Sequence, residues 1–578
     1  MQFTGDRLVR LLLIVVAGLS FAMLARSQDR DQGRSMVTTK YGIVAAESPL
    51  AAQAGAQILA HGGNAIDAAV ATNAVMGVVE PMMNGIGGDL FVIVYDAKTG
   101  KLYGLNASGW SPKTLTPEFL KSKGITRMPF VGIDSVTVPG VVDGWSKLLK
   151  RFGKLNFEQD LAPAIRYARE GFPVPEWDAA YWANAAHFLA ENPGTANLYL
   201  LNGEAPKVGE VFRNEDLARS LQQIASGGRD AFYKGEISRQ ILALSKREGG
   251  AMTAEDLADF SAEWVEPLST QYHGWTVYEL PPNGQGIAAL EMLNLMSQFP
   301  LAQYGHNSAD ALHIMIEAKK LAYADLRRYV GDPRFAKIPV AGLLSDEYAR
   351  ERAKLIDMSH ANCDVSAGMP PGGDTTYLTA VDAQGNMVSL IQSNYEEFGS
   401  RLVPDGAGFV LQDRGALFNL DPDSPDVLAG HKRPLHTIIP AFMANGDMRI
   451  AFGIMGGYNQ AQAHAQFVSN VVDFGMNIQA SMEAARFTKM TFTGCDVQME
   501  NRIPADVRSA LEARGHQIQL RGAYSANMGG GQAVERNFST GVNFGASDPR
   551  KDGEAIPEPL PPLPLAPRSS KPQSGSHR

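Results

Sequence analysis

Cysteine is scarce in this sequence: Cys363 and Cys495 are the only two among 578 residues. One possible pair cannot make the disulfide framework that holds small secreted domains together, so the fold must depend on an apolar core. Histidine is sparse too, with 11 residues scattered along the chain and no Cys/His cluster at zinc-ligand spacing. The sequence therefore predicts no metal site.

Basic residues are in deficit. Lys and Arg total 52 against 61 Asp and Glu, which gives a formal net charge of −9. A surface that binds nucleic acid needs a basic excess, and no basic run occurs, so we expect no nucleic-acid partner. With 45% apolar and 20% charged residues, the chain is long enough for more than one core and for a cleft. A small molecule is the expected ligand.

Long apolar runs are nearly absent. The one that stands out, residues 11–24, follows two arginines and precedes a short stretch of small residues. This pattern is typical of a secretory signal peptide over residues 1–27, and the run is shorter than the ~20 apolar residues that span a bilayer. We expect a periplasmic or secreted protein that begins near Gln28 and keeps no stable membrane span after processing. An uncleaved membrane anchor is the alternative.

Nucleotide-binding fingerprints are missing. The glycine-rich stretch at residues 84–89 follows two helical segments, the first closed by Gly62 and Gly63 and the second capped by Asn64, and it leads into an apolar strand at 90–95. Its order of glycines matches neither nucleotide fingerprint, so we interpret it as tight packing. The sequence predicts no cofactor.

A β-hairpin is predicted in the second half of the chain. Residues 370–373 read Pro-Pro-Gly-Gly, which breaks regular structure, and β-forming residues begin at Thr375. A turn over residues 382–386 then leads to a returning strand over 387–393.

A long amphipathic helix is predicted before this hairpin. Apolar residues recur at helical spacing over residues 312–323, and Gly331 and Pro333 end the pattern. His313 and Glu317 lie one turn apart on this helix. We interpret them as a surface pair rather than as metal ligands.

Several stretches together resemble a known family. The junction Asp374-Thr375-Thr376 is followed, in order, by residues 393–400, 432–437, 453–457 and 545–550. In that order and at those intervals they resemble the small subunit of the γ-glutamyltranspeptidase family, whose members are self-processing N-terminal-nucleophile hydrolases. Residues 41–95 resemble the opening of the family's large subunit. The resemblance covers nearly all of residues 40–550 and implies an α+β fold, an αββα four-layer sandwich of stacked antiparallel sheets.

The resemblance also implies that the chain cuts itself. Thr375 matches the family's catalytic threonine, and cleavage of the Asp374–Thr375 bond leaves a large subunit of residues 28–374 and a small catalytic subunit of residues 375–578. We expect the two products to remain together as a heterodimer. Within the small subunit, residues 556–578 are rich in Pro and Ser and are predicted to be a disordered tail.

Threonine chemistry gives a reason for the cut. A threonine hydroxyl is a poor nucleophile at neutral pH, so a base must lie within hydrogen-bond reach. A free α-amine on Thr375 itself, with a pKa of about 8, meets that need. Because the cut ends must separate to open the site and Cys363 lies close before them, we expect Cys363 and Cys495 to remain thiols without a catalytic role.

Further site residues follow from the family's motifs. Ser393 matches a second hydroxyl residue that orients the nucleophile, and the backbone N–H groups of Gly456 and Gly457 match the oxyanion donors. The stretch that borders the substrate in the family matches Arg433, His436 and Thr437. His436 also suggests a Ser/His triad, but no Gly-x-Ser-x-Gly elbow supports one, so we expect a packing or substrate-wall histidine.

The sequence departs from the family at the residues that bind the glutamyl head group of the substrate. Residues 106–112 lack the arginine that pairs with the α-carboxylate, and Leu417 stands where an aspartate pairs with the α-ammonium. Asp413 and Arg414 lie nearby and are the expected substitutes in substrate binding. The sequence is therefore more similar to the branch of transpeptidase-like proteins, glutaryl-type cephalosporin acylases and oxamate amidohydrolases.

Two classes of function are compatible with the sequence. The first is a γ-glutamyltransferase or glutathione hydrolase-like threonine enzyme that cleaves γ-glutamyl or related acyl amides through an acyl-threonine intermediate. A glutaryl-type (cephalosporin) acylase or an oxamate-type amidohydrolase is an alternative within this class. The second is an uncleaved, non-enzymatic family member. Retention of Thr375, Ser393 and the Gly456-Gly457 pair favours the enzyme.

Overall fold

The computed structural model describes residues 32–364 and 374–561. The chain divides at Ser35 into a short N-terminal unit and one large unit, and every described helix and strand lies in the large unit. The predicted signal peptide and the Pro-Pro-Gly-Gly loop lie outside the described residues. Within the part of the chain that is described, no helix is both long and apolar enough to cross a membrane.

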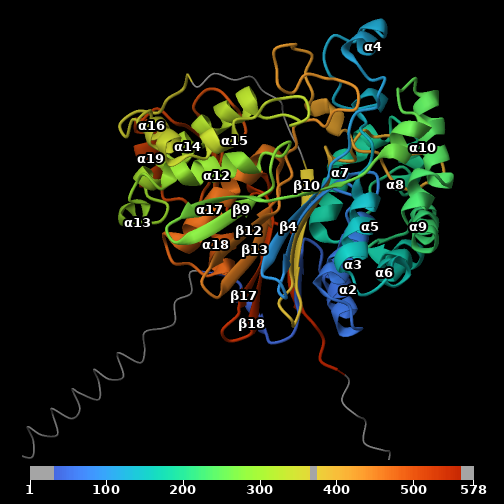
Figure 1. Ribbon diagram of the computed structural model, residues 1–578, viewed down its shortest axis with the longest axis horizontal. Helices are drawn as coiled ribbons and strands as arrows, with labels where there is room; N and C mark the ends of the chain where they lie inside the picture. Colours follow the sequence, from blue (N-terminus) through green and yellow to red (C-terminus); the bar gives the residue numbers. More distant parts are fainter. Residues whose placement is uncertain (1–31, 365–373, 562–578) are drawn as a thin grey trace, which may run out of the picture. The chain divides into compact units, whose positions relative to one another are not determined.

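Two seven-stranded sheets form the centre of the large unit (Figure 1). We call them the β13 sheet and the β10 sheet, and the strands in each pair antiparallel. In spatial order the β13 sheet contains β1 (Val37–Thr39), β18 (Val542–Ser547), β17 (Gly531–Asn537), β13 (Met448–Ile454), β12 (Ala441–Asn445), β9 (Trp275–Glu279) and β8 (Leu268–Tyr272). The β10 sheet contains β19 (Glu554–Pro557), β2 (Ile43–Ala46), β10 (Asp374–Val381), β11 (Met387–Tyr395), β3 (Asp89–Asp96), β4 (Lys101–Ala107) and β7 (Glu263–Val265).

The two sheets pack face to face through alternate residues of their strands. Ile43, Phe91 and Tyr377 of the β10 sheet share one buried cluster with Phe442 and Val534 of the β13 sheet. Because side chains alternate across a strand, the intervening residues face outward and need a second cover. Both sheets therefore require a helical layer on their outer faces.

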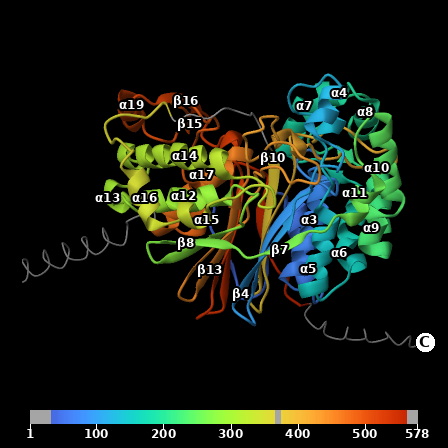
Figure 2. The same ribbon diagram turned by 45° about the horizontal axis from the view of Figure 1, so that its top comes forward.

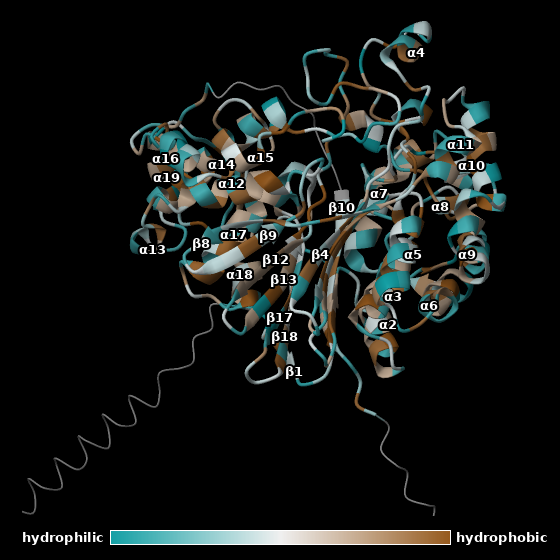
Figure 3. Ribbon diagram, in the orientation of Figure 1, coloured by the Kyte–Doolittle hydropathy of each residue, from teal (hydrophilic) through white to brown (hydrophobic). Residues whose placement is uncertain are grey.

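Helices supply these outer layers, on opposite sides of the sheet pair (Figure 2). The helices that lie on the β10 sheet are α2 (Pro49–Ala60), α3 (Ala65–Val79) and α5 (Val141–Phe152). The same hydrophobic cluster extends to α6 (Phe157–Glu170), α7 (Glu176–Leu189), α9 (Glu215–Tyr233) and α10 (Glu236–Arg247). The helices that lie on the β13 sheet are α12 (Gly286–Met296), α17 (Gln460–Val472) and α18 (Ile478–Glu483). The same hydrophobic cluster extends to α14 (Ala309–Tyr329), which packs on α12, and to α19 (Ala505–Ala513). Hydrophobic colour is concentrated on the strands and on the helix faces beside them (Figure 3). The predicted αββα sandwich is confirmed.

Two local predictions, the helix cap at Asn64 and the tight packing of the glycine-rich stretch, agree with the structure. Asn64 caps α3 by accepting hydrogen bonds from the amides of Ile66 and Asp67. A Cβ atom added to Gly87 would lie 2.0 Å from the carbonyl oxygen of Val410, and one on Gly88 would lie 2.5 Å from that of Ser393. The glycine-rich stretch is therefore tight packing, as predicted, and it supports the backbone of Ser393.

Three predictions are wrong. His313 and Glu317 are not a surface pair, because both are buried. His313 contacts His516, which directly precedes the last strand of a small sheet formed by β14 (Phe487–Thr488), β15 (Asp496–Glu500) and β16 (Gln517–Arg521). Cys363 and Cys495 are not free thiols but form a disulfide. The predicted start of the disordered tail at residue 556 is also wrong. Ile556 and Pro557 belong to β19, which pairs with β2 because the open edge of that sheet offers backbone hydrogen-bond partners.

Candidate active site

Thr375 lies at the start of β10, where the strand pairing is interrupted. Asp374 pairs with Tyr395 and Thr376 pairs with Gln392, so Thr375 lies opposite Ser393 and its neighbour in a β-bulge. Bulges re-aim a side chain at the end of a strand and are frequent beside active sites. The Thr375 side chain is fully buried.

The hydroxyl of Thr375 has a defined partner. Gln460 Nε2 donates a hydrogen bond to Thr375 Oγ1 over 3.4 Å. Gln460 is itself held in place, because its Oε1 accepts a hydrogen bond from Ile439 N at 3.0 Å. Ser393 Oγ accepts a hydrogen bond from Tyr395 N at 2.7 Å, so this hydroxyl is tied to the backbone beside the bulge.

The glycine pair precedes the same helix that carries Gln460. Gly456 and Gly457 connect β13 to the 3₁₀ turn before α17, with φ angles of +119° and +57° that strongly favour glycine. Among the described residues, nothing accepts a hydrogen bond from either amide. Two free N–H groups therefore lie at the amino-terminal end of α17, where partial positive charge accumulates.

A buried glutamine, Gln285, connects this glycine turn to the stretch that contains His436 and Thr437. Gln285, just before α12, donates from Nε2 to the carbonyl oxygens of Gly457 (2.8 Å) and Thr437 (2.5 Å). Its backbone N–H also donates to His436 O at 2.9 Å. One side chain thus fixes the glycine turn against the stretch that contains Thr437. Sequence reasoning missed Gln285 and Gln460, whose partners are distant in sequence.

Arg414 brings an incompletely satisfied positive charge into the site. Its Nη1 donates to Thr437 Oγ1 at 2.7 Å, and its guanidinium lies 4.5 Å from the centre of the Tyr395 ring. The side chain is fully buried, yet Nε and Nη2 have no partner among the described residues. A buried guanidinium with free N–H groups is suited to bind a carboxylate.

Asp413 lies beside this arginine with one oxygen free. Asp413 Oδ1 accepts a hydrogen bond from Glu396 N at 3.1 Å, while Oδ2 has no partner among the described residues. Burial raises the pKa of Asp413 to about 7, although that amide and Arg414 oppose the shift. Near neutral pH the group is therefore divided between a neutral acid and a carboxylate.

His436 and Arg433 make their polar contacts with other residues of the protein. His436 Nε2 contacts Asp89 Oδ2 at 2.9 Å, and its ring packs 4.7 Å from that of Phe91. Burial, aided by Arg414 and Arg433, holds the pKa of His436 well below its usual range, and burial raises the pKa of Asp89 to about 7. This neutral, enclosed imidazole has the geometry of a packing histidine.

Arg433 occupies the region where the expected arginine is missing. Its Nε donates to Ser108 O at 2.9 Å, within the 106–112 stretch, and its Nη1 pairs with Glu263 at 2.9 Å. Nη2 has no partner among the described residues. Two of its three nitrogens are thus already used in holding the protein together.

A pocket of about 510 Å³ opens next to these groups. Leu417, Leu435, Tyr458 and Phe492 give it an apolar and aromatic lining, and Arg327 adds a charge. Tyr458 directly follows Gly457, so the pocket borders the glycine turn. Its size and mixed lining suit a small organic molecule.

Two buried glutamates lie behind the start of β10. Thr376 Oγ1 donates to Glu80 Oε2 at 3.1 Å, and Tyr377 N donates to Glu47 Oε1 at 3.3 Å. Burial raises the pKa of Glu80 to about 8. These side chains hold the strand that carries Thr375 in place. No motif or spacing in the sequence had singled them out.

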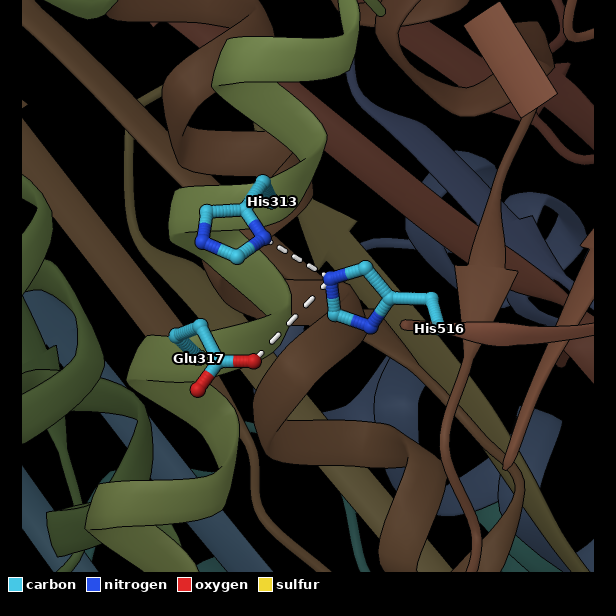
Figure 4. A group of neighbouring side chains, drawn as sticks. All are labelled: His313, Glu317 and His516. Carbon is cyan, nitrogen blue, oxygen red and sulfur yellow. Dashed lines mark hydrogen bonds and ion pairs between the residues drawn. The ribbon is translucent and has the colours of Figure 1, made fainter. Parts of the chain in front are cut away.

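One group of side chains has the composition of a metal site. His313, Glu317 and His516 are buried, with ligand atoms within 4.8 Å of one another (Figure 4). His313 Nε2 donates to Asp357 O at 2.9 Å, so its Nδ1 accepts from His516 Nε2 at 2.8 Å. Lys320 Nζ lies 2.7 Å from Glu317 Oε1. The ammonium already supplies the cation for this carboxylate, and we assign no metal here.

Two stacked antiparallel sheets between helical layers are the αββα sandwich of the N-terminal-nucleophile hydrolase class. The family model for gamma-glutamyltranspeptidase matches residues 51–558. The chain belongs to the gamma-glutamyltranspeptidase family and is a hydrolase of that family.

Individual relatives agree with this assignment. The chain is 37% identical to the glutathione hydrolase-like YwrD proenzyme of Bacillus subtilis (strain 168), covering 90% of this chain and 99% of that one. It is 35% identical to the acylase ACY 1 proenzyme of Pseudomonas sp. (strain SE83), covering 89% and 93%. The crystal structure of cephalosporin acylase from Bacillus halodurans superposes with a TM-score of 0.86 at 44% identity, covering 92% of this chain and 98% of that one.

Proposed function

We propose that this protein is a self-processing amidohydrolase that uses Thr375 as its nucleophile. The observation that carries the proposal is the arrangement around Thr375 Oγ1. Gln460 donates a hydrogen bond to this hydroxyl, and Gly456 and Gly457, whose amides have no acceptor among the described residues, directly precede the helix that Gln460 begins. A nucleophile and a preorganised pair of N–H donors are what acyl transfer requires.

Self-cleavage is the first proposed reaction. Thr375 Oγ attacks the carbonyl carbon of Asp374, the C–N bond breaks, and the released α-amine of Thr375 takes a proton. The product is an ester between Asp374 and the Thr375 side chain. Water then hydrolyses this ester, which frees the Asp374 carboxylate and restores the hydroxyl. The names of the relatives, which are proenzymes, support this step.

Substrate cleavage repeats the same chemistry. The α-amine of Thr375 accepts the proton of the hydroxyl as Oγ attacks the amide carbonyl carbon, and the Gly456 and Gly457 amides stabilise the resulting oxyanion. The C–N bond breaks as the leaving amine takes that proton. Water hydrolyses the acyl-threonine ester and releases the acid.

The preferred acyl group is proposed to carry a terminal carboxylate and no required α-amine. Arg414 offers two nitrogens, Nε and Nη2, that have no partner among the described residues, whereas Leu417 stands in the place of the ammonium-binding aspartate. The charges of Asp89 and Asp413 act on this guanidinium, but its free nitrogens still lack acceptors among the described residues. Buried donors without acceptors are costly, so a substrate carboxylate that accepts from them gains binding energy. Glutaryl and other dicarboxylic monoamides fit this description.

Recognition of γ-glutamyl amides is the second candidate, and one observation favours it. Asp413 Oδ2 is buried and has no partner among the described residues, so it is available to pair with a substrate ammonium. Matched hydrolysis of glutaryl-p-nitroanilide and γ-glutamyl-p-nitroanilide separates the two. We expect kcat/KM for the glutaryl compound to equal or exceed that for the γ-glutamyl compound. A hundredfold preference for the γ-glutamyl compound, about 2.7 kcal/mol, would instead establish α-amine recognition.

A further inference from the structure

The disulfide between Cys363 and Cys495 crosses the proposed cleavage point. The two residues are separated by 132 positions, with Cα atoms 5.0 Å apart. Cys363 lies before the Asp374–Thr375 bond and Cys495 lies after it. We propose that this disulfide is an interchain bond of the mature protein, which keeps the two products of self-cleavage covalently joined. The proposal rests on the self-cleavage proposed above.

Hydrogen bonds across the proposed subunits hold both cysteines in this position. Ala361 N donates to Arg514 O at 2.7 Å, and Gly494 N donates to Cys363 O at 3.2 Å. The backbone of Ala361 and of Cys363 itself is therefore bound to the chain that follows the cut. The bond does not depend on residues 365–373, which lie outside the described residues.

Glu317, one of the residues drawn in Figure 4, and Lys320 on the same helix also hold the segment that contains Cys363. Lys320 Nζ donates to Asn362 O at 2.9 Å, and Asn362 N donates to Glu317 Oε2 at 3.3 Å. Lys320 Nζ also lies 3.6 Å from Cys495 Sγ. The helix α14 thus binds both the residue before Cys363 and the sulfur of its partner, which explains why polar side chains are buried there.

This group also extends across the proposed subunit boundary. His516, in the chain after the cut, donates to His313 in the chain before it. Burial lowers the pKa of His313 to about 4 and that of His516 to about 3, so both rings are neutral at physiological pH. Because both imidazole rings are neutral, the ion pair in this buried region is the one between Lys320 and Glu317.

A covalent bond changes the molecularity of unfolding. Both sheets contain strands from each proposed subunit, so the subunits cannot separate while the sheets persist. Once the chain is cut, global unfolding releases two chains unless the disulfide joins them. The Tm of a two-chain protein rises with its concentration, whereas that of a covalently joined protein does not. Opening the disulfide should therefore affect the cut and the uncut protein differently.

Reduction gives experimental access to this bond. Cys363 is exposed and Cys495 is buried, so a thiol reagent can approach from the Cys363 side. A dithiol such as dithiothreitol breaks the S–S bond by transferring two electrons and two protons, which leaves two thiols and the cyclic disulfide of the reagent. Cleavage at Asp374–Thr375 is not reversed by this step.

Denaturing gels with and without dithiothreitol test the proposal on protein exported to the periplasm and alkylated before lysis. We expect wild type to run as one band of full mature mass without reductant and as two bands with it. Cys363→Ser should give two bands in both lanes, and Thr375→Ala one band in both. Cys495→Ser provides an independent second variant and should behave as Cys363→Ser does.

The alternative outcomes are distinguishable. Two bands from wild type without reductant would refute the interchain bond and leave self-cleavage intact. One band in both lanes would refute self-cleavage and, with it, the interchain role. A second readout is the Tm of reduced wild type over a hundredfold range of protein concentration. It should rise with concentration, whereas the Tm of unreduced wild type and of reduced Thr375→Ala should stay constant.

Discussion

Gln460 Nε2 donates a hydrogen bond to Thr375 Oγ1 over 3.4 Å. Because the hydroxyl oxygen accepts this bond, its own proton remains available for transfer to a base. The contact is long for a hydrogen bond, as is common for catalytic groups before a substrate is bound. It ties the start of β10 to α17, the helix that the free glycine amides precede.

Gln460→Glu should reduce turnover while preserving the fold. The substitution keeps an oxygen to accept from Ile439 N and replaces the donor that faces Thr375. We expect kcat to fall roughly tenfold to a hundredfold, the effect of losing one hydrogen bond to a developing charge, with KM changed little. Steady-state kinetics measures both values. An unchanged kcat in a variant that is fully cut would show that Gln460 does not act on the nucleophile.

Arg414→Met should abolish recognition of the substrate acid. We expect kcat/KM for glutaryl-p-nitroanilide to fall about a hundredfold, or about 2.7 kcal/mol, because the acid loses its charged partner. Hydrolysis of the neutral pentanoyl-p-nitroanilide should change less than threefold. Arg327→Met, in the wall of the neighbouring pocket, is the matched control. If Arg327→Met alone removed the preference for an acid, the carboxylate site would lie in that pocket.

Asp160→Asn should stabilise the protein at alkaline pH. Asp160 is buried with no partner for either oxygen among the described residues, and burial, followed by repulsion from Asp67, raises its pKa to about 8. A carboxyl whose pKa is raised on folding contributes its full stability below its unfolded pKa of about 4. That stability is lost progressively as the pH rises toward the folded pKa of about 8, and the loss is complete above it. The side-chain amide introduced by Asp160→Asn does not ionise, so the variant does not lose stability in this way.

The comparison of Tm values for wild type and Asp160→Asn checks this sign. We expect no difference larger than about 1 °C at pH 5 and a gain of about 2–5 °C for the variant at pH 9. Asp506→Asn, at an exposed position in the first turn of α19, is the control and should show no such pH dependence. A variant that is equally stable or less stable than wild type at pH 9 would contradict the assigned pKa shift.

Export is expected from the leader sequence. We propose that residues 1–27 direct the chain to the periplasm or the medium and are removed there. Fractionation of cells followed by amino-terminal sequencing of the large chain should place the protein outside the cytosol, with its first residue near Gln28. Recovery of cytosolic protein that still begins at Met1 would contradict export.

The features that the sequence predicted are those with local causes. Asn64 was identified as a cap because its partners, Ile66 and Asp67, follow it directly. The β10–β11 hairpin was predicted because a turn and two strand patterns are adjacent in the chain. The family motifs singled out Thr375 and the glycine pair. The structure adds the link between them, because Gln460, which donates to Thr375 Oγ1, begins the helix that follows the glycines.

The features that were missed depend on partners far apart in sequence. Gln460 is 85 residues from Thr375, and His516 is 203 residues from His313. Periodicity cannot indicate such pairs, so a buried pair on α14 was interpreted as a surface pair. The cysteine prediction failed for the same reason. It was based on how Cys363 would move after a cut, whereas the partner that Cys363 binds lies 132 residues away in sequence.

Amino-terminal sequencing of the small chain tests the central claim most directly. Purified wild type, reduced and separated on a denaturing gel, should give a small chain that begins Thr-Thr-Tyr-Leu, at Thr375. Thr375→Ala, purified in parallel, should give no small chain. A small chain that begins at any other residue, or wild type that stays uncut while it hydrolyses glutaryl-p-nitroanilide, would contradict Thr375 as the nucleophile.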